Sequence, residues 1–201
     1  MKDLFILVAD KNMEYALKGA VARPKALGIR PVEADIRPHA GRDGGARKTG
    51  PELLALQRRL YRHALLVFDF EGSGTDLPNN ETLEAELDAR LEVRWGKDAK
   101  SIVIAPELEV WIWGSDNAVE NAIDWPAGQG IRKWLLEKGF KFDPNSKPCR
   151  PKEALEAALN ITRQPRSSTL FQNIASHISL ARCNDNAFVR LRSRLQEWFS
   201  Q

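Results

Sequence analysis

The chain has 201 residues, of which 43% are hydrophobic and 28% charged, and its formal net charge is +3. These values are typical of a globular protein with one domain, or one domain and a small appendage, and so small a net charge does not by itself indicate nucleic-acid binding. The two cysteines, Cys149 and Cys183, are far apart and lack CxxC spacing. The sequence therefore favours neither a disulfide framework nor a zinc site.

The sequence contains no pattern typical of a membrane or export segment. A short apolar run near the amino terminus, within MKDLFILVADKN, is followed at once by charges and lacks the length and cleavage site of a signal peptide. No stretch approaches the roughly 20 apolar residues of a membrane span. We therefore expect a cytoplasmic protein that does not associate with membranes.

Strand-like and helix-like segments alternate through the first half of the chain. Strands are predicted at residues 4–9, 30–36, 64–68 and 101–105. Helices are predicted at residues 12–23, 52–62 and 78–93, and again from residue 107. The basic, glycine-rich residues 37–51 are predicted to form a loop. This order predicts an α/β fold with a mostly parallel central sheet of about four strands, flanked by helices.

The second half of the chain carries helical patterns alone. After residue 116 these patterns lie at residues 130–138, 152–162, 167–177 and 185–199. We expect an α/β core in residues 1–116 and a helical C-terminal extension in residues 117–201 that packs on the core. Ligands of open α/β sheets bind beyond the carboxyl ends of the strands, so the residues just after each strand are the first candidates for a site.

Acidic residues follow three of the four predicted strands. They are Asp10 and Glu14 after the first strand, Asp69 and Glu71 after the third, and Glu107 and Glu109 after the fourth. Because right-handed crossovers bring the ends of parallel strands to one edge, we expect these acids to converge. Like charges in one place are unfavourable unless a cation neutralises them, and carboxylate oxygens suit Mg²⁺ or Mn²⁺. Such an ion polarises a phosphoryl oxygen and lowers the pKa of bound water.

Each acid also has a structural interpretation. Asp10 is well placed to cap the following helix, and Glu14 to lie in solvent or form a salt bridge. Glu107 and Glu109 stand at the start of a helix, where acids favour the helix dipole. The agreement of three strand ends favours a joint functional site over separate structural roles.

Three segments together resemble a known family. VADKNMEYAL and VFDFEGSG resemble the Toprim-type domain, the metal-binding α/β module of topoisomerases, primases and OLD-type nucleases, which places an acid after its first strand and a DxD pair after its third. PELEVWIWGSD is similar to the PExExW motif of small bacterial Toprim-like proteins, and RPKEALEAAL, PRSSTLFQNIA and LQEWF resemble the same group. Asp10 stands where Toprim proteins have Glu, and Glu71 where they have the second Asp. These departures keep the charge but change the length of the side chain by one methylene.

The resemblance implies a metal-dependent nuclease or nucleic-acid-processing protein with Mg²⁺ or Mn²⁺ as its cofactor. The implied catalytic residues are Asp69, Glu71, Glu107 and Glu109. The implied metal ligands are Asp10, Glu14, Asp69, Glu71 and Glu107. Some similar proteins are components of a methylation-associated anti-phage defence system, so nucleic acid and other subunits of such a system are the expected partners.

Basic residues on both sides of the acids are candidates for binding phosphates. They are Arg42, Arg47 and Lys48 in the predicted loop and Lys152 and Arg166 in the C-terminal part. The same residues also suit a solvated surface or a docking face for a partner protein.

Two other functions remain open from the sequence. The chain suits a non-catalytic subunit that keeps the Toprim scaffold and binds partner proteins of a defence complex, because it is small and its acids depart from the family pattern. It also suits a phosphatase or nucleotide-processing enzyme that uses the same acids on a small substrate. The sequence does not distinguish DNA, RNA and nucleotides as substrates.

Overall fold

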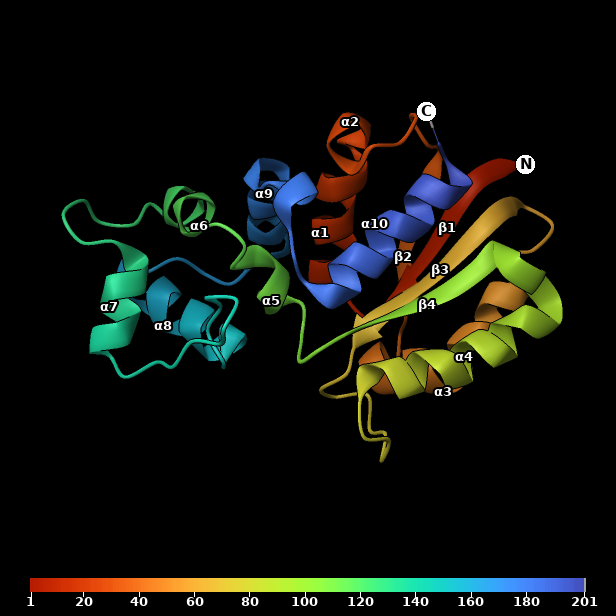
Figure 1. Cartoon of the computed structure of the whole chain (residues 1–201), viewed down its shortest axis with the longest axis horizontal. Helices are drawn as coiled ribbons and strands as arrows, with labels where there is room; N and C mark the ends of the chain where they lie inside the picture. The colour runs from red at the N-terminus through yellow and green to blue at the C-terminus, as the bar shows by residue number, and fades with distance from the viewer. Residues whose placement is uncertain (201) are drawn as a thin grey trace.

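The computed structural model describes residues 1–200, and its centre is one parallel sheet (Figure 1). The strands are β1 (Lys2–Val8), β2 (Ala34–Pro38), β3 (Tyr61–Asp69) and β4 (Ala99–Ile104). They lie in the order β2-β1-β3-β4, and every neighbouring pair is parallel. The two inner strands are covered on both faces, which is why β1 and β3 have nearly continuous apolar sequences. The predicted sheet of about four strands is thus confirmed.

Helices cover both faces of the sheet (Figure 1). In the first half of the chain they are α1 (Lys11–Val21), α2 (Pro24–Leu27), α3 (Arg42–Ala55) and α4 (Asn80–Trp95), and a 3₁₀ turn spans Gly96–Asp98. The helices α3 and α4 lie on one face, and α1 covers the other together with α10, the last helix of the chain. On α4, Leu83, Leu87 and Leu91 recur every four residues and form a buried stripe.

The C-terminal half is helical, as expected. Its helices are α5 (Glu109–Ile112), α6 (Asp116–Ala122), α7 (Ile131–Glu137), α8 (Pro151–Thr162), α9 (Ser168–His177) and α10 (Asn186–Trp198), with a 3₁₀ turn at Leu180–Arg182. In Figure 1, α6, α7 and α8 lie beyond the carboxyl ends of the strands, whereas α9 packs on α1 and α10 returns to the sheet. The division of the chain into two domains at residue 116 stays a prediction.

After α8 the chain comes back to the α/β core, where α9 packs closely on α1. Gly19 of α1 lies against α9 so closely that a Cβ atom there would be 2.8 Å from the carbonyl oxygen of Gln172. A larger residue would therefore push the two helices apart. Through this contact the C-terminal segments are fixed relative to the start of α1, where one of the predicted acids lies.

The prediction for residues 37–62 is wrong in two respects. The residues from Arg42 onward form α3 instead of a loop, because Ala46, Gly50 and Leu54 recur at helical spacing and are buried against the sheet. A Cβ at Gly50 would lie 2.7 Å from Leu66 Cδ1, so the small residue is what lets the helix pack.

The end of this segment differs from the prediction as well. The helix α3 ends at Ala55, and β3 already begins at Tyr61, so no helix extends to residue 62. Leu53, Leu56 and Leu60, which a helix over residues 52–62 would place on one face, are 40%, 73% and 58% exposed.

Smaller differences concern the second strand and the aromatic residues. The strand β2 begins at Ala34, later than predicted, and the short helices α2 and α6 were not predicted. Trp111 and Trp113 are both buried, and their indole nitrogens donate to Asp185 and to the carbonyl of Pro151, respectively. Among the helices of residues 1–200, none has the length and apolar character needed to cross a membrane.

Candidate functional site

A polar hollow of about 340 Å³ lies where the strands end. Its acidic lining residues are Asp10, Asp43, Asp69, Glu71, Glu107, Glu109, Glu153 and Glu156. Its basic lining residues are Arg42, Lys152 and Arg166, and Gly72 completes the lining. The structure therefore brings together acids from all three predicted strand ends. Glu14 does not line the hollow.

The backbone places the acids after β3 and β4 side by side. The amide of Phe70 donates to the carbonyl of Ile104 at 2.7 Å, and the amide of Glu71 donates to the carbonyl of Pro106 at 3.0 Å. These bonds continue the β3–β4 ladder past the end of the sheet, so Glu71 and Glu107 emerge from adjacent segments. On the other side of β3, Asp10 follows β1 and caps α1, since its Oδ1 accepts from the amide of Met13 at 2.9 Å.

Asp43 was not predicted as a site residue, although it lies among the acids. It belongs to the first turn of α3, and its Oδ1 accepts a hydrogen bond of 2.9 Å from the backbone amide of Asp69. The strand β2 lies next to β1, so an acid soon after β2 reaches the same edge of the sheet. Asp43 was missed because residues 37–51 were predicted to form a loop. A helix predicted to begin at residue 42 would have placed Asp43 in its first turn, near the same edge of the sheet.

Burial and neighbouring negative charges raise the pKa values of Asp43, Asp69 and Glu107. Burial raises the pKa of Asp69 well above its usual value, and the charge of Asp43 raises it further. The Oδ1 atom of Asp69 is buried and accepts no hydrogen bond from residues 1–200. The pKa of Asp43 is also raised, mainly by burial. Burial, followed by the charge of Glu109, raises the pKa of Glu107 to about 7. Both causes disfavour the ionised carboxylates, as expected for like charges away from water.

Two basic residues from the C-terminal half bind acids of the hollow. Arg166 forms an ion pair with Glu109, which is only 1% exposed. The backbone amide of Lys152 donates to Glu107 Oε1 at 3.2 Å, and its Nζ lies 4.0 Å from Glu107 Oε2. Arg42 is different, because it is exposed and forms no ion pair with any residue from 1 to 200. It is therefore the cation of the lining that is free to meet an outside anion.

The other predicted site residues have their own partners or lie outside the hollow. The guanidinium of Arg47 donates to the carbonyls of Ser73 and Gly74, both at 2.8 Å, and so holds the loop after β3. Lys48 is exposed. Glu14 is bound by Lys18 at 2.6 Å across one helical turn.

The chemistry of the hollow fits a hard divalent cation. Within residues 1–200, no three His, Cys, Asp or Glu side chains are grouped so that they could hold a metal ion directly. Mg²⁺, however, keeps several of its waters and usually binds through one or two carboxylates. The lining supplies such oxygens, and Asp69 has a buried oxygen without a partner. A hydrated Mg²⁺ or Mn²⁺ on one or two of these carboxylates is therefore compatible with the lining.

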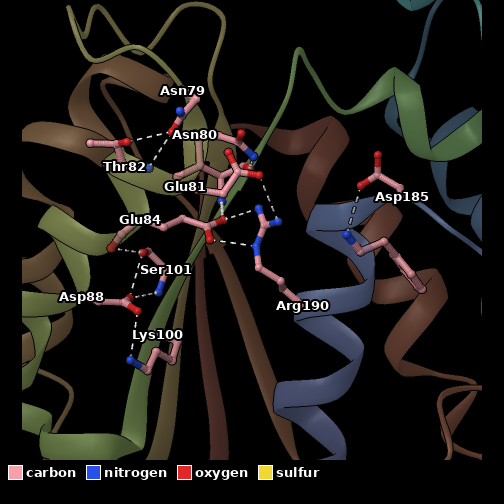
Figure 2. Close-up of polar contacts among 12 residues, drawn as sticks. Asn79, Asn80, Glu81, Thr82, Glu84, Asp88, Lys100, Ser101, Asp185 and Arg190 are labelled. Atoms are coloured by element: carbon pink, nitrogen blue, oxygen red, sulfur yellow. Dashed lines mark hydrogen bonds and ion pairs between the residues drawn. The ribbon is translucent and has the colours of Figure 1, made fainter. Parts of the chain in front are cut away.

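A second group of polar side chains, along α4, provides a contrast (Figure 2). Asn80, Glu84 and Asp88 recur every four residues and face the edge strand β4. Asn80 donates to the carbonyl of Val103 at 2.9 Å, Glu84 accepts from the amide of Val103 at 2.6 Å, and Asp88 accepts from the amide of Ser101 at 2.7 Å. From Glu84 to Asp88 the helix rises about 6 Å, which matches the roughly 6.6 Å between Val103 and Ser101 on the strand.

This α4 network closes the outer edge of the sheet. The side chains bind backbone groups of β4 that would otherwise be free to pair with another strand. Arg190 of α10 adds a hydrogen bond of 2.8 Å to Glu84, and Lys100 adds one of 2.9 Å to Asp88 (Figure 2). Each acid of this network is thus matched by donors.

Comparison with known proteins gives one structural relationship. The fold is similar to that of the C-terminal region of the Burkholderia pseudomallei OLD protein, with a TM-score of 0.54, 11% sequence identity and 98% of each chain covered. No family model matches the sequence, and no curated protein matches it. The expected α/β fold, a parallel sheet flanked by helices, is confirmed by the sheet topology, and the OLD protein region shares it.

Proposed function

We propose that this protein is a metal-dependent, Toprim-like nuclease that hydrolyses phosphodiester bonds. The observation that carries the proposal is the convergence of buried, mutually repelling acids at the carboxyl end of a sheet whose fold is shared with an OLD protein region. Repulsion of this kind is unfavourable in the free protein and is relieved when a cation binds. Oxygen-only donors favour Mg²⁺ or Mn²⁺ over softer metals.

Some of the acids would bind the ion, and others would transfer protons or position a basic side chain. Asp69 and Glu71, on the strand end and the loop after it, would hold a hydrated ion together with Asp10, one or two of them directly and the rest through its waters. A bound ion of this type polarises a phosphoryl oxygen and lowers the pKa of its water. Glu107, whose pKa is about 7, would exchange a proton near neutral pH, as a general base requires. Glu109 would orient Arg166, its ion-pair partner.

Basic residues at the rim would bind the phosphates of the substrate. Arg42 lines the hollow without an ion-pair partner among residues 1–200, so it is the first candidate. Lys152 and Arg166 would contact phosphate when the substrate competes for their carboxylate partners. Lys48 would add a further phosphate contact along α3, and Arg47 would hold the glycine-containing loop after β3. Glu14 would join the site only after its release from Lys18.

We further propose that the nuclease acts in a bacterial anti-phage defence system in the cytoplasm, with other subunits of that system as partners. The support is the resemblance of PELEVW and of the C-terminal segments to components of such systems. A nuclease of this kind must be restrained until infection. The ion pairs that occupy Glu107 and Glu109 are consistent with a restrained state.

A cleavage assay tests the proposed activity. Labelled DNA and RNA, single-stranded and duplex, are incubated with the protein and Mg²⁺ or Mn²⁺. The variant Asp69→Asn should lose cleavage by about 100-fold or more, since it removes the carboxylate with the unpartnered oxygen. The variant Asp76→Asn, which changes an exposed acid nearby, is the matched control and should cleave normally. Equal cleavage by the wild type and Asp69→Asn would exclude the proposed site.

A non-catalytic scaffold is the second candidate function. It is favoured by the ion pairs of Glu107 and Glu109 and by the lack of a preformed three-acid group within residues 1–200. The two functions differ in metal binding, because an ion that binds the native state raises its melting temperature. A melting temperature that is the same with and without Mg²⁺ and Mn²⁺ would favour the scaffold.

A further inference from the structure

We propose that Asp43 is part of the cation site and acts with Asp69 to hold the ion. This inference rests on the proposed function, since it assigns a further residue to the same site. It adds an acid from the helix after β2 to those after β1, β3 and β4. All four strands of the sheet then contribute to one centre.

The geometry leaves half of the Asp43 carboxylate free for a ligand. Its Oδ1 accepts the amide hydrogen of Asp69, which ties the start of α3 to the end of β3. Its Oδ2 points toward Gly72, where a Cβ atom would lie only 3.5 Å away, and both residues line the hollow. The Asp69 side chain in the same hollow has a buried Oδ1 without a protein donor. Two carboxylates with free oxygens therefore stand next to each other.

A structural role explains the hydrogen bond but not the charge. An asparagine at position 43 would accept the same bond from the Asp69 amide without placing a second negative charge beside a buried carboxylate. The dipole of α3 favours an acid in its first turn, but any exposed position of that turn would serve equally well. The carboxylate at this place is therefore best explained by a cation that binds between the two acids.

The start of α3 is built so that Asp43 is held in place. The amide of Gly41 donates to His39 Nδ1 at 2.8 Å, and the His39 ring lies so close to Gly45 that a Cβ there would be 2.5 Å from its Cε1. Arg42 adopts a left-handed conformation with φ of 50° between these residues. A strained residue of this kind persists where the surrounding contacts enforce its conformation, and Arg42 directly precedes Asp43.

The test compares Mn²⁺ binding by the wild type, Asp43→Asn and Asp69→Asn. Free Mn²⁺ is counted by electron paramagnetic resonance during titration, and melting curves are recorded with and without the ion. Asp43→Asn keeps the acceptor for the Asp69 amide, so it should fold, melt at the wild-type temperature or above it without metal, and bind Mn²⁺ about 10-fold or more weakly. Asp43→Glu restores the charge and should bind more tightly than Asp43→Asn. Asp76→Asn again serves as the matched control.

The outcomes separate this inference from the proposed function. Wild-type affinity in Asp43→Asn, together with lost binding in Asp69→Asn, would overturn the role of Asp43 and leave the cation site intact. A metal-free melting temperature of Asp43→Asn well below that of the wild type would also overturn it, because the charge would then be structural. No binding of Mn²⁺ by the wild type would overturn both.

Discussion

The acids along α4 and the acids of the hollow both include buried carboxylates, but they differ in what surrounds them. Glu84 and Asp88 of the α4 network accept hydrogen bonds from backbone amides of β4 and from basic side chains. Asp69 of the hollow has a buried oxygen without a donor among residues 1–200 and a second carboxylate beside it. Burial alone therefore does not mark a functional acid. A buried carboxylate oxygen without a donor, next to a second carboxylate, is the better marker, because a purely structural acid is stabilised by donors around its oxygens.

The largest expected effect is the loss of a matched acid. Glu84→Ala leaves the amide of Val103 and the guanidinium of Arg190 without their acceptor. The free energy of unfolding should fall by about 3 kcal/mol, as is typical when one partner of a buried pair is removed. Thermal and denaturant melts measure this loss. The increase in melting temperature on adding Mn²⁺ should be the same as in the wild type, and a loss of that increase would mean that the two groups of acids are not distinct.

An acid of the hollow should make the protein less stable when it ionises, and the pH dependence of stability should show this. The pKa of Glu107 is about 7 in the folded protein and 4.5 as its ordinary value, so the native state binds the extra proton between these limits. Without metal, the contribution of Glu107 is present below about pH 4.5 and is lost as the pH rises through 7, a change of at most about 3 kcal/mol.

The matched variant for this prediction is Glu107→Gln. Denaturant melts at several pH values between 4.5 and 8 should give a flatter profile for this variant than for the wild type. A profile that rises with pH in the wild type through this range, or that is equally steep in both proteins, would contradict the repulsion inferred for the hollow.

The smallest expected effect concerns Asp69 without metal. Asp69→Asn removes one of the mutually repelling charges, so the metal-free protein should become more stable by about 1 kcal/mol, the interaction energy of two nearby charges screened by water. Denaturant melts at pH 8 with a chelator present measure this gain. A clear loss of stability instead would place Asp69 with Glu84, as an acid that the fold requires.

The sequence predicted the strands that position the site, and the acids that follow them, because both form strong local patterns. The apolar runs of β1, β3 and β4 are unbroken, and the acids follow them at once, so Asp10, Asp69 and Glu107 could be assigned to one edge. Parallel strands with right-handed crossovers end at the same edge, so the grouping of these acids followed from the order of strands and helices alone. The α4 stripe of leucines was equally clear from its spacing.

The sequence did not predict the features that depend on small residues and distant contacts. The helix α3 packs on the sheet through Ala46 and Gly50, which do not register as a hydrophobic stripe, so Asp43 was assigned to a loop. The pairing of Arg166 with Glu109 joins residues 57 positions apart, and only the return of the C-terminal segments brings them together. Patterns with a period of two or four residues do not carry such information.

A structure of the protein crystallised with Mn²⁺ tests the central claim most directly, that the acids at the carboxyl end of the sheet share a divalent cation. Anomalous scattering locates the ion without assumptions about its ligands. The account predicts a peak in the hollow, coordinated directly or through water by Asp69 and Asp43. A peak elsewhere, or a hollow without an ion in which Glu107 and Glu109 keep Lys152 and Arg166 at saturating Mn²⁺, would contradict it.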